Sequence, residues 1–246
     1  MAKLRVFETY QEMCKEVALE MQEQLKANPK TLLCIASGHT STGLFECLVR
    51  MFEDGSIDFS KAAFIAMDEW LNMSEKTPGS CGAFVNTHFL NKVNFEQDNI
   101  RLFDGTASDL TLECGAADEF IIEKSQHGVM DYVVLGSGMN GHLALNEPGC
   151  DFNTRVHVAR LDESTKQVGQ KYFQEKTELS GGITLGIGNF AEARRCVLMI
   201  SGSHKHEILH KIVESQISNK IPATVIKKFA NASIFCDNDA YCLAQQ

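Results

Sequence analysis

The sequence has few features of a secreted, membrane-bound or nucleic-acid-binding protein. Its 246 residues include only four prolines and one tryptophan, and no repeat or low-complexity tract interrupts them. No long apolar run follows the N-terminus, so we expect neither a signal peptide nor a membrane span. Lysine and arginine number 23 against 32 acidic residues, which gives a formal net charge of −9 without a basic cluster. These absences disfavour nucleic-acid and membrane partners and predict a cytoplasmic protein, in which a local pocket for a small anion remains compatible with the charge.

Nine cysteines are present, but their spacing fits neither metal binding nor a disulfide framework. No CxxC pair and no cysteine–histidine cluster has the spacing of zinc ligands, so we expect no metal site. Cys34, Cys196 and Cys236 fall in apolar runs, which predicts buried, reduced thiols that pack as small hydrophobic groups. Cys81 and Cys150 stand beside glycines in loops, and we expect these two to be exposed.

What the sequence does contain is an alternation of apolar runs and amphipathic segments. Seven runs predict strands at residues 32–36, 63–67, 100–103, 131–135, 183–187, 197–200 and 233–236. Helices are predicted at residues 13–25, after a capping box that starts at Thr9, and at residues 42–53, 110–125 and 204–215. This order predicts an α/β, Rossmann-like fold, with a mainly parallel twisted sheet of about seven strands and helices on both faces. Nothing marks a domain boundary, so we expect residues 1–246 to form one domain.

The segment from Gly136 to Gly149 is the most informative, because it follows a predicted strand and combines glycines with His142 and Glu147. A carboxylate near an imidazole can orient it for acid–base work, whereas a lone histidine is more often structural. Gly136, Gly138 and Gly141 also match the GxGxxG pattern of dinucleotide sites. That reading is disfavoured because no acid ends a strand about 20 residues further on, as this fingerprint requires.

Three further polar segments follow predicted strands. Ser37, Gly38, His39 and Thr40 precede a helix, and free amides at a helix N-terminus can bind an anion; an ordinary capped turn is the alternative. The P-loop ending is missing, so a nucleotide site of that kind is not indicated.

The second of these segments is Asp68-Glu69-Trp70, and the third contains Lys205. A carboxylate at the end of a buried strand can serve as a general base, although a turn cap and a solvated acid are the plainer reading. Lys205 stands at the start of a predicted helix, where a cation is unfavourable unless an anion is bound. A solvated surface lysine is the alternative for that residue.

Together the four segments resemble the glucosamine-6-phosphate deaminase/isomerase family and its relatives, the 6-phosphogluconolactonases. The resemblance extends from the Ser37 loop to about Asp237, and its most specific part is Asn-Gly-His-x-x-x-Asn-Glu-Pro at residues 140–148. Lactonases typically continue differently after the Gly-His pair. Met67-Asp68-Glu69 also matches the deaminase pattern.

The resemblance implies a cofactor-independent isomerisation and deamination of a hexosamine 6-phosphate, which is a hydrolysis of a C–N bond. Asp68 would move a proton between C1 and C2 of the open-chain sugar. His142 would assist ring opening, with Glu147 orienting it and Asn140 beside it. The family position of Asn140 carries an aspartate in the glucosamine enzymes, and asparagine cannot exchange a proton at neutral pH.

The resemblance also implies the binding residues. The phosphate would be held by Ser37, Gly38, His39, Thr40, Lys205 and Lys171. Lys171 stands where many members have arginine, and it keeps the charge without the bidentate fork. The pocket would further include Glu69, Trp70, Gly138 and Gly141.

Asn140 and the segments 68–70, 78–81 and 139–143 look closest to the galactosamine-6-phosphate branch, so we expect a galacto substrate over the gluco epimer. A 6-phosphogluconolactonase and a non-catalytic sugar-phosphate sensor are the alternatives. Some deaminases of the family are allosteric hexamers with a second site between subunits, which leaves a homo-oligomer open. Residues 155–159 have little of the basic character of that second site, so we expect no such regulation.

Overall fold

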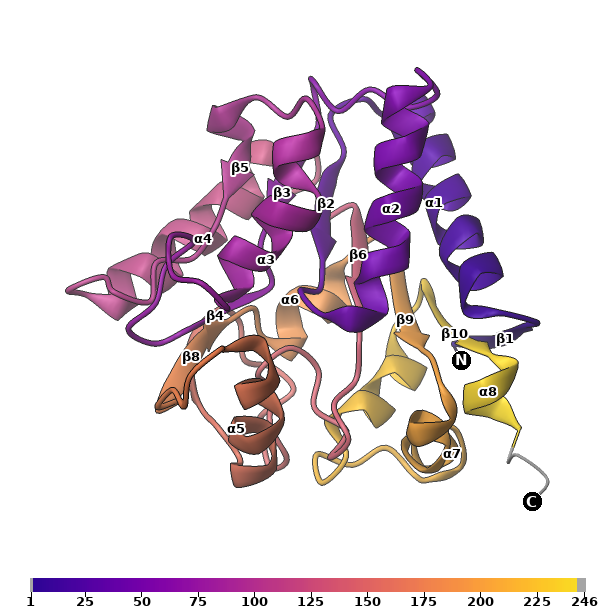
Figure 1. The fold of residues 1–246 in the computed structure, drawn as a ribbon, viewed down its shortest axis with the longest axis vertical. Helices are drawn as coiled ribbons and strands as arrows, with labels where there is room; N and C mark the ends of the chain where they lie inside the picture. Colours follow the sequence, from indigo (N-terminus) through magenta and orange to yellow (C-terminus); the bar gives the residue numbers. More distant parts are fainter. Residues whose placement is uncertain (1, 243–246) are drawn as a thin grey trace.

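The computed structural model describes residues 2–242, which form two sheets surrounded by helices (Figure 1). The larger sheet has seven parallel strands in the order β1-β10-β9-β6-β2-β3-β5. These strands are β1 (Lys3–Phe7), β2 (Leu32–Ile35), β3 (Ala63–Ile65), β5 (Ile100–Arg101), β6 (Tyr132–Leu135), β9 (Cys196–Ile200) and β10 (Ala232–Asp237). The predicted fold class, a parallel α/β sheet of about seven strands, is confirmed.

The smaller sheet is antiparallel and was not predicted. It consists of β4 (Asp68–Trp70), β8 (Gly181–Thr184) and β7 (His157–Arg160), in that order. The run at residues 183–187 was therefore assigned to the wrong sheet, and β1 completes the seven strands instead. Most residues of β1 are exposed because this strand lies at an edge of the sheet. The strand therefore lacks the apolar run that marks the buried strands.

Eight helices and five short 3-10 turns connect the strands within residues 2–242. The helices are α1 (Tyr10–Ala27), α2 (His39–Glu53), α3 (Cys81–His88), α4 (Leu110–Lys124), α5 (Glu163–Gly169), α6 (Ile187–Glu192), α7 (His206–Glu214) and α8 (Asn238–Tyr241). The turns are η1 (Leu90–Lys92), η2 (Gln97–Asn99), η3 (Gln170–Tyr172), η4 (Ser203–Lys205) and η5 (Pro222–Lys228). Thr9 caps α1 as predicted, because its hydroxyl accepts from the Glu12 amide at 3.2 Å.

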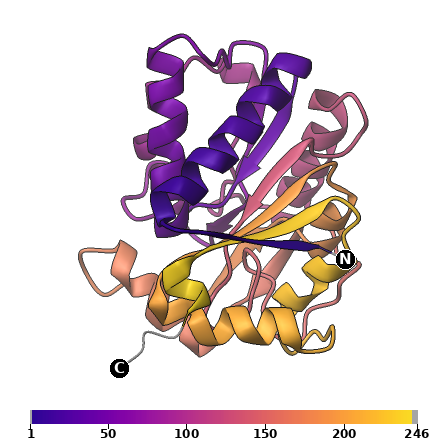
Figure 2. The same cartoon turned by 90° about the vertical axis from the view of Figure 1, so that its right-hand side faces the viewer.

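The order of the strands reverses between two neighbours, β2 and β6. From β2 the chain continues outward to β3, whereas from β6 the next strand of the large sheet is β9, on the opposite side. Figure 2 shows α1 and α2 on one side of the sheet and α4 on the other. The loops that follow β2 and β6 separate at this switch point, which is where open α/β sheets leave a crevice for a ligand.

The core consists mainly of the large sheet and the helices packed on it, and the central strands β2, β6 and β9 are buried at every position. A second, smaller apolar cluster lies at the small sheet and contains Trp70, Leu145 and Leu179. Cys81 also belongs to this cluster and is buried, so its predicted exposure was wrong; Cys150 is partly exposed. Among residues 2–242, no helix combines the length and apolarity needed to cross a membrane.

Candidate active site

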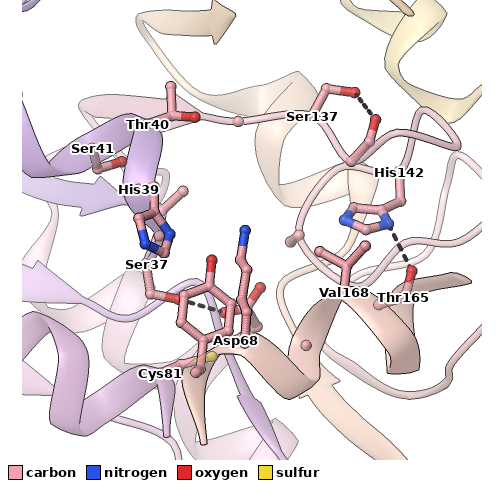
Figure 3. A pocket seen from close by; sticks show the side chains of 18 of the residues that line it. Ser37, His39, Thr40, Ser41, Asp68, Cys81, Ser137, His142, Thr165 and Val168 are labelled. Atoms are coloured by element: carbon pink, nitrogen blue, oxygen red, sulfur yellow. Dashed lines mark hydrogen bonds between the residues drawn. The ribbon is translucent and has the colours of Figure 1, made fainter. Parts of the chain in front are cut away.

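A cavity of about 390 Å³ opens at the switch point between the two sheets. The loops after β2 and β6, strand β4, the start of α3, the segment 164–172 and the turn η4 all contribute to its wall. Figure 3 shows Ser37, His39, Asp68 and Cys81 on one side, with His142 and Thr165 across from them. The structure therefore brings together the four segments that the sequence singled out.

One side of the cavity is the loop that joins β2 to α2. Helix α2 begins at His39, three residues earlier than predicted, so Thr40 and Ser41 belong to its first turn. Gly38 has a φ of 143°, a conformation that favours glycine, and a Cβ there would lie 3.2 Å from the Tyr172 hydroxyl. Burial, the charge of Lys171 and the neighbouring His88 lower the pKa of His39. This loop offers hydroxyls and helix N-terminal amides to an anion.

Two lysines reach the same end of the cavity. Lys205 was predicted in the first turn of a helix at residues 204–215. It lies instead in η4, and α7 begins one residue later, at His206. Its Nζ donates to the Ser137 carbonyl oxygen at 2.6 Å. Burial, together with the charge of Lys171, lowers the pKa of Lys205 to about 8. Lys171 stands at the exposed rim, and partial burial lowers its pKa as well. Two ammonium groups in one cavity repel each other, and a bound dianion would offset this repulsion.

Asp68 supplies the carboxylate of the cavity. It is the first residue of β4 and is 9% exposed, with Ser37 Oγ donating to its Oδ1 at 3.4 Å. Burial raises the pKa of Asp68 to about 6, against smaller lowering effects of the Cys81 thiol, the His142 charge and Ser37. A carboxylate with this pKa can hold or release a proton near neutral pH.

Glu69 lies behind the wall of the cavity and does not line it, contrary to the prediction. Successive residues of a strand point to opposite faces, so Glu69 faces away from Asp68. Its carboxylate accepts from the backbone amides of Trp70 at 2.8 Å, Cys81 at 3.0 Å and Gly82 at 2.8 Å. Glu69 therefore anchors the start of α3 to β4, while Trp70 does line the cavity as predicted.

His142 is held from several sides by its own loop and by α5. Its Nδ1 lies 3.5 Å from Glu147 Oε2 and 3.1 Å from Thr165 Oγ1. A Cβ on Gly138 would overlap the imidazole, so the ring packs directly on that glycine. With Nδ1 engaged in this way, Nε2 is the ring nitrogen left for a ligand.

Glu147 and Asn140 complete this group. Asn140 Nδ2 donates to Glu147 Oε2 at 2.8 Å, and its Oδ1 accepts from the His142 amide at 3.1 Å. Burial alone would raise the pKa of Glu147, but its hydrogen bonds with His142, Thr165 and Asn140, and the His142 charge, together lower it. Glu147 is not part of the cavity wall and reaches the ligand only through His142. Gly141 is also outside the wall; its φ of 84° and close contact with Ile221 make it a turn residue.

Several residues of the wall were not predicted from the sequence, including Cys81, Tyr172, Thr165 and Ser137. The capping residue Asp162, which precedes α5, was a local signal for the helix that carries Thr165. Nothing local indicated that this helix faces His142. Within residues 2–242, no group of three or more histidine, cysteine, aspartate or glutamate side chains is arranged to hold a metal ion.

Known proteins similar to this chain share both its sequence and its fold. The glucosamine-6-phosphate deaminase of Thermoanaerobacter pseudethanolicus is 34% identical over 242 residues, which cover 98% of this chain and 94% of the relative. Glucosamine-6-phosphate deaminase 2 of Bacillus subtilis is 32% identical, covering 97% and 96%.

Among solved structures, a monomeric glucosamine-6-phosphate deaminase superposes with a TM-score of 0.93 at 28% identity, covering 98% of this chain and all of that one. The 6-phosphogluconolactonase of Thermotoga maritima shares the fold at 16% identity, with a TM-score of 0.77 over 97% of this chain and all of that one. A model of the family described as glucosamine-6-phosphate isomerases/6-phosphogluconolactonase matches residues 6–235. By its sequence and its fold, this chain belongs to that family.

Proposed function

We propose that this protein is a cofactor-independent deaminase and isomerase of a hexosamine 6-phosphate, with galactosamine 6-phosphate as its preferred substrate. The observation that carries the proposal is that one cavity holds a buried carboxylate with a pKa of about 6, Asp68, across from the imidazole of His142. Two lysines and a helix N-terminus lie in the same cavity. Relatives that are glucosamine-6-phosphate deaminases cover nearly the whole chain, which supports the reaction class.

The chemistry starts with ring opening. His142 Nε2 takes the proton of the anomeric hydroxyl and returns a proton to the ring oxygen, which gives the open-chain aldehyde. Asp68 then removes the proton from C2, beside the aldehyde, while the aldehyde oxygen takes a proton from the ammonium at C2. The resulting enolamine is protonated at C1 by Asp68. The iminium now at C2 reacts with water, which gives a ketone and releases ammonia. Because Asp68 gains and returns one proton, it ends the cycle ionised.

The phosphate supplies binding energy at a distance from the reacting carbons. Lys205, Lys171 and the amides at the start of α2 hold it, and the sugar is thereby oriented toward Asp68 and His142. Lys205 already donates to the Ser137 carbonyl, so its ammonium is fixed near the position of the anion before the substrate arrives. This pre-arrangement lowers the cost of ordering a long side chain on binding.

The galacto preference rests on Asn140. Its amide nitrogen donates to Glu147 at 2.8 Å, a bond that an aspartate carboxylate cannot form at neutral pH. Two carboxylates at this distance would repel each other, so the ring-opening group of this chain carries one negative charge fewer than one with aspartate. The ring-opening group of this chain thus differs from one with aspartate. This difference is consistent with a substrate that differs from glucosamine 6-phosphate at C4.

The test is an ammonia-release assay on galactosamine 6-phosphate and glucosamine 6-phosphate, with 6-phosphogluconolactone measured in parallel. We expect both amino sugars to release ammonia and form a ketose phosphate, with the higher kcat/KM for the galacto epimer. A higher value for the gluco epimer would remove the galacto preference. Folded protein that hydrolyses only the lactone, or binds the sugars without turnover, would overturn the deaminase assignment.

A further inference from the structure

We propose that Thr165 is a positioning residue for His142, and that the segment Glu163–Tyr172 transmits phosphate binding to the imidazole. The inference rests on the proposed function, because it concerns how the phosphate end of the substrate affects the ring-opening end. Thr165 belongs to α5, whereas His142 belongs to the loop after β6. Their contact therefore joins two separate elements of the cavity wall.

The first observation is the environment of Thr165. Its side chain is buried, and Oγ1 lies 3.1 Å from His142 Nδ1. Glu147 Oε2 lies 3.5 Å from the same nitrogen and accepts from Asn140 at 2.8 Å. A carboxylate can only accept, so Nδ1 carries the proton that points toward Glu147 and Thr165, and Nε2 is the nitrogen without a proton in the neutral form of the ring. The threonine hydroxyl can accept from Nδ1 while it donates to the carboxylate, and so fixes both groups.

The second observation is that the same segment reaches the phosphate end. Lys171 and Tyr172 follow α5 in η3 and both line the cavity. The rings of Tyr172 and His39 lie 5.5 Å apart, which places the end of the segment against the loop after β2. At 1.5 Å per helical residue, the six residues from Thr165 to Lys171 span about 9 Å. One short element therefore touches both the phosphate loop and the ring-opening group.

The third observation is that this element is held together along its length. Asp162 caps α5 by accepting from the Ser164 amide at 2.9 Å. Beyond the helix, the Gln170 side chain donates to the Thr177 carbonyl at 2.7 Å and accepts from its amide at 3.0 Å. Gly169 packs tightly on Leu179, since a Cβ there would lie 2.7 Å from Leu179 Cδ1. These contacts tie the end of α5 to residues 177–179, and we expect an anion that draws Lys171 inward to displace Thr165 together with it.

Ser164 adds a second connection, because its Oγ lies 3.4 Å from Asn140 Nδ2. The remaining charged groups near His142 are Asp68 across the cavity and Asp162 before α5. Within residues 2–242 neither of them makes a hydrogen bond to the ring, so the hydroxyl of Thr165 and the carboxylate of Glu147 define its orientation.

The experiment compares Thr165→Val with Thr165→Ser, and with Thr106→Val as a matched control on an exposed threonine that bonds only to Asp104. In the wild type, ¹⁵N NMR of His142 is expected to show the tautomer with a proton on Nδ1. Inorganic phosphate, used as the probe, is expected to shift these imidazole signals. In Thr165→Val we expect a mixture of tautomers and no shift with phosphate, with the wild-type behaviour restored by serine.

Kinetics give the second readout. A misplacement of a catalytic group by 1 Å can cost about 100-fold in rate, so we expect Thr165→Val to lower kcat by about that factor. KM should stay within about threefold, because Lys205 and the start of α2 still hold the phosphate. Unchanged kcat, or a phosphate shift that persists in Thr165→Val, would overturn the inference. If folded wild-type protein turns over neither amino-sugar phosphate, the proposed function fails, while the NMR comparison still decides the role of Thr165.

Discussion

The two sheets contribute to the cavity in different ways. The large parallel sheet is apolar through its central strands and places its polar groups in the loops beyond them: Ser37 after β2 and His142 after β6. The small antiparallel sheet carries its polar groups within the strand itself, where Asp68 faces the cavity and Glu69 faces α3. Loops can adjust around a bound anion, whereas a carboxylate on a paired strand is held at one depth of burial. This difference explains why the cavity carboxylate with the raised pKa, Asp68, is on the small sheet.

The largest effect is expected from removing Asp68, the proposed base on the small sheet. Asp68→Asn keeps the size and the contact with Ser37 but cannot take the C2 proton. General-base catalysis contributes about 10²–10⁴-fold, so we expect kcat for the amino-sugar phosphate to fall by about 10³-fold with little change in KM. Asp98→Asn, on an exposed aspartate, is the matched control. A variant that keeps more than a tenth of the wild-type kcat would show that another group moves the proton.

Glu69→Ala tests the other face of the same strand. It would leave three buried backbone amides, those of Trp70, Cys81 and Gly82, without their acceptor. An unsatisfied buried donor costs about 1–3 kcal/mol, and partial rescue by water lowers the sum, so we expect a loss of about 2–4 kcal/mol in the free energy of unfolding. Urea titration gives this value, with Glu23→Ala on an exposed glutamate as the control. A loss below about 0.5 kcal/mol would mean that Glu69 does not anchor α3.

On the large sheet, Gly138→Ala tests how the loop after β6 holds its histidine. The new Cβ would overlap the His142 ring, so the ring must leave its place beside Glu147 and Thr165. We expect kcat to fall by about 10²-fold, the effect of a displacement of about 1 Å. Gly115→Ala is the control, since that helical glycine has no atom within 4 Å of the added methyl group. Equal kcat values for the two variants would show that the position of the ring on Gly138 is unimportant.

Lys205→Met tests the proposed phosphate-binding lysine in the turn after β9 of the large sheet. The test includes the dependence of KM on pH. The pKa of Lys205 is about 8, so the wild-type ammonium loses its charge above this pH and KM for the sugar phosphate should rise there. A hydrogen bond to a charged group contributes about 1.5–3 kcal/mol, so the variant should raise KM about 10–100-fold at pH 7. Its KM should also lack the rise near pH 8, while Lys220→Met, on an exposed lysine, should keep it. A rise that persists in Lys205→Met would assign the titration to another group.

Most of the large sheet could be predicted from sequence because its central strands are buried on both faces and therefore appear as apolar runs, whereas the exposed edge strand β1 was missed. The residues of its loops, Ser37 and His142, follow those runs directly. The small sheet could not be predicted in this way, since β4 has only three residues and they are Asp, Glu and Trp. Its partner β8 looked like one more strand of the parallel sheet. Asp68 was nevertheless chosen by its position after an apolar run, whereas the opposite direction of Glu69 depends on a pairing that no local pattern shows.

The smallest expected effect is on the stability of Asp68→Asn. It measures how much the buried charge of Asp68 lowers the free energy of unfolding. Burial raises the pKa of Asp68 from an ordinary 3.8 to about 6. Between these two values the native carboxyl keeps a proton that the unfolded chain has lost, so the free energy of unfolding falls as the pH rises. Above pH 6 the folded protein bears the full cost of burying the Asp68 charge, and two pKa units correspond to about 3 kcal/mol. Asparagine has no charge and avoids this cost.

We therefore expect Asp68→Asn to be more stable than the wild type by about 1–3 kcal/mol at pH 8, with no gain near pH 4. Urea titrations of both proteins at the two pH values would measure this difference. Asp98→Asn should show no such gain at either pH, because an exposed aspartate has an unburied charge. Equal stability of Asp68→Asn and wild type at pH 8 would mean that the Asp68 carboxylate is solvated in the folded protein, and that its placement on the small sheet does not tune it. A gain that disappears at low pH would instead show that the fold keeps a destabilising charge on β4, as expected if Asp68 is the proposed base.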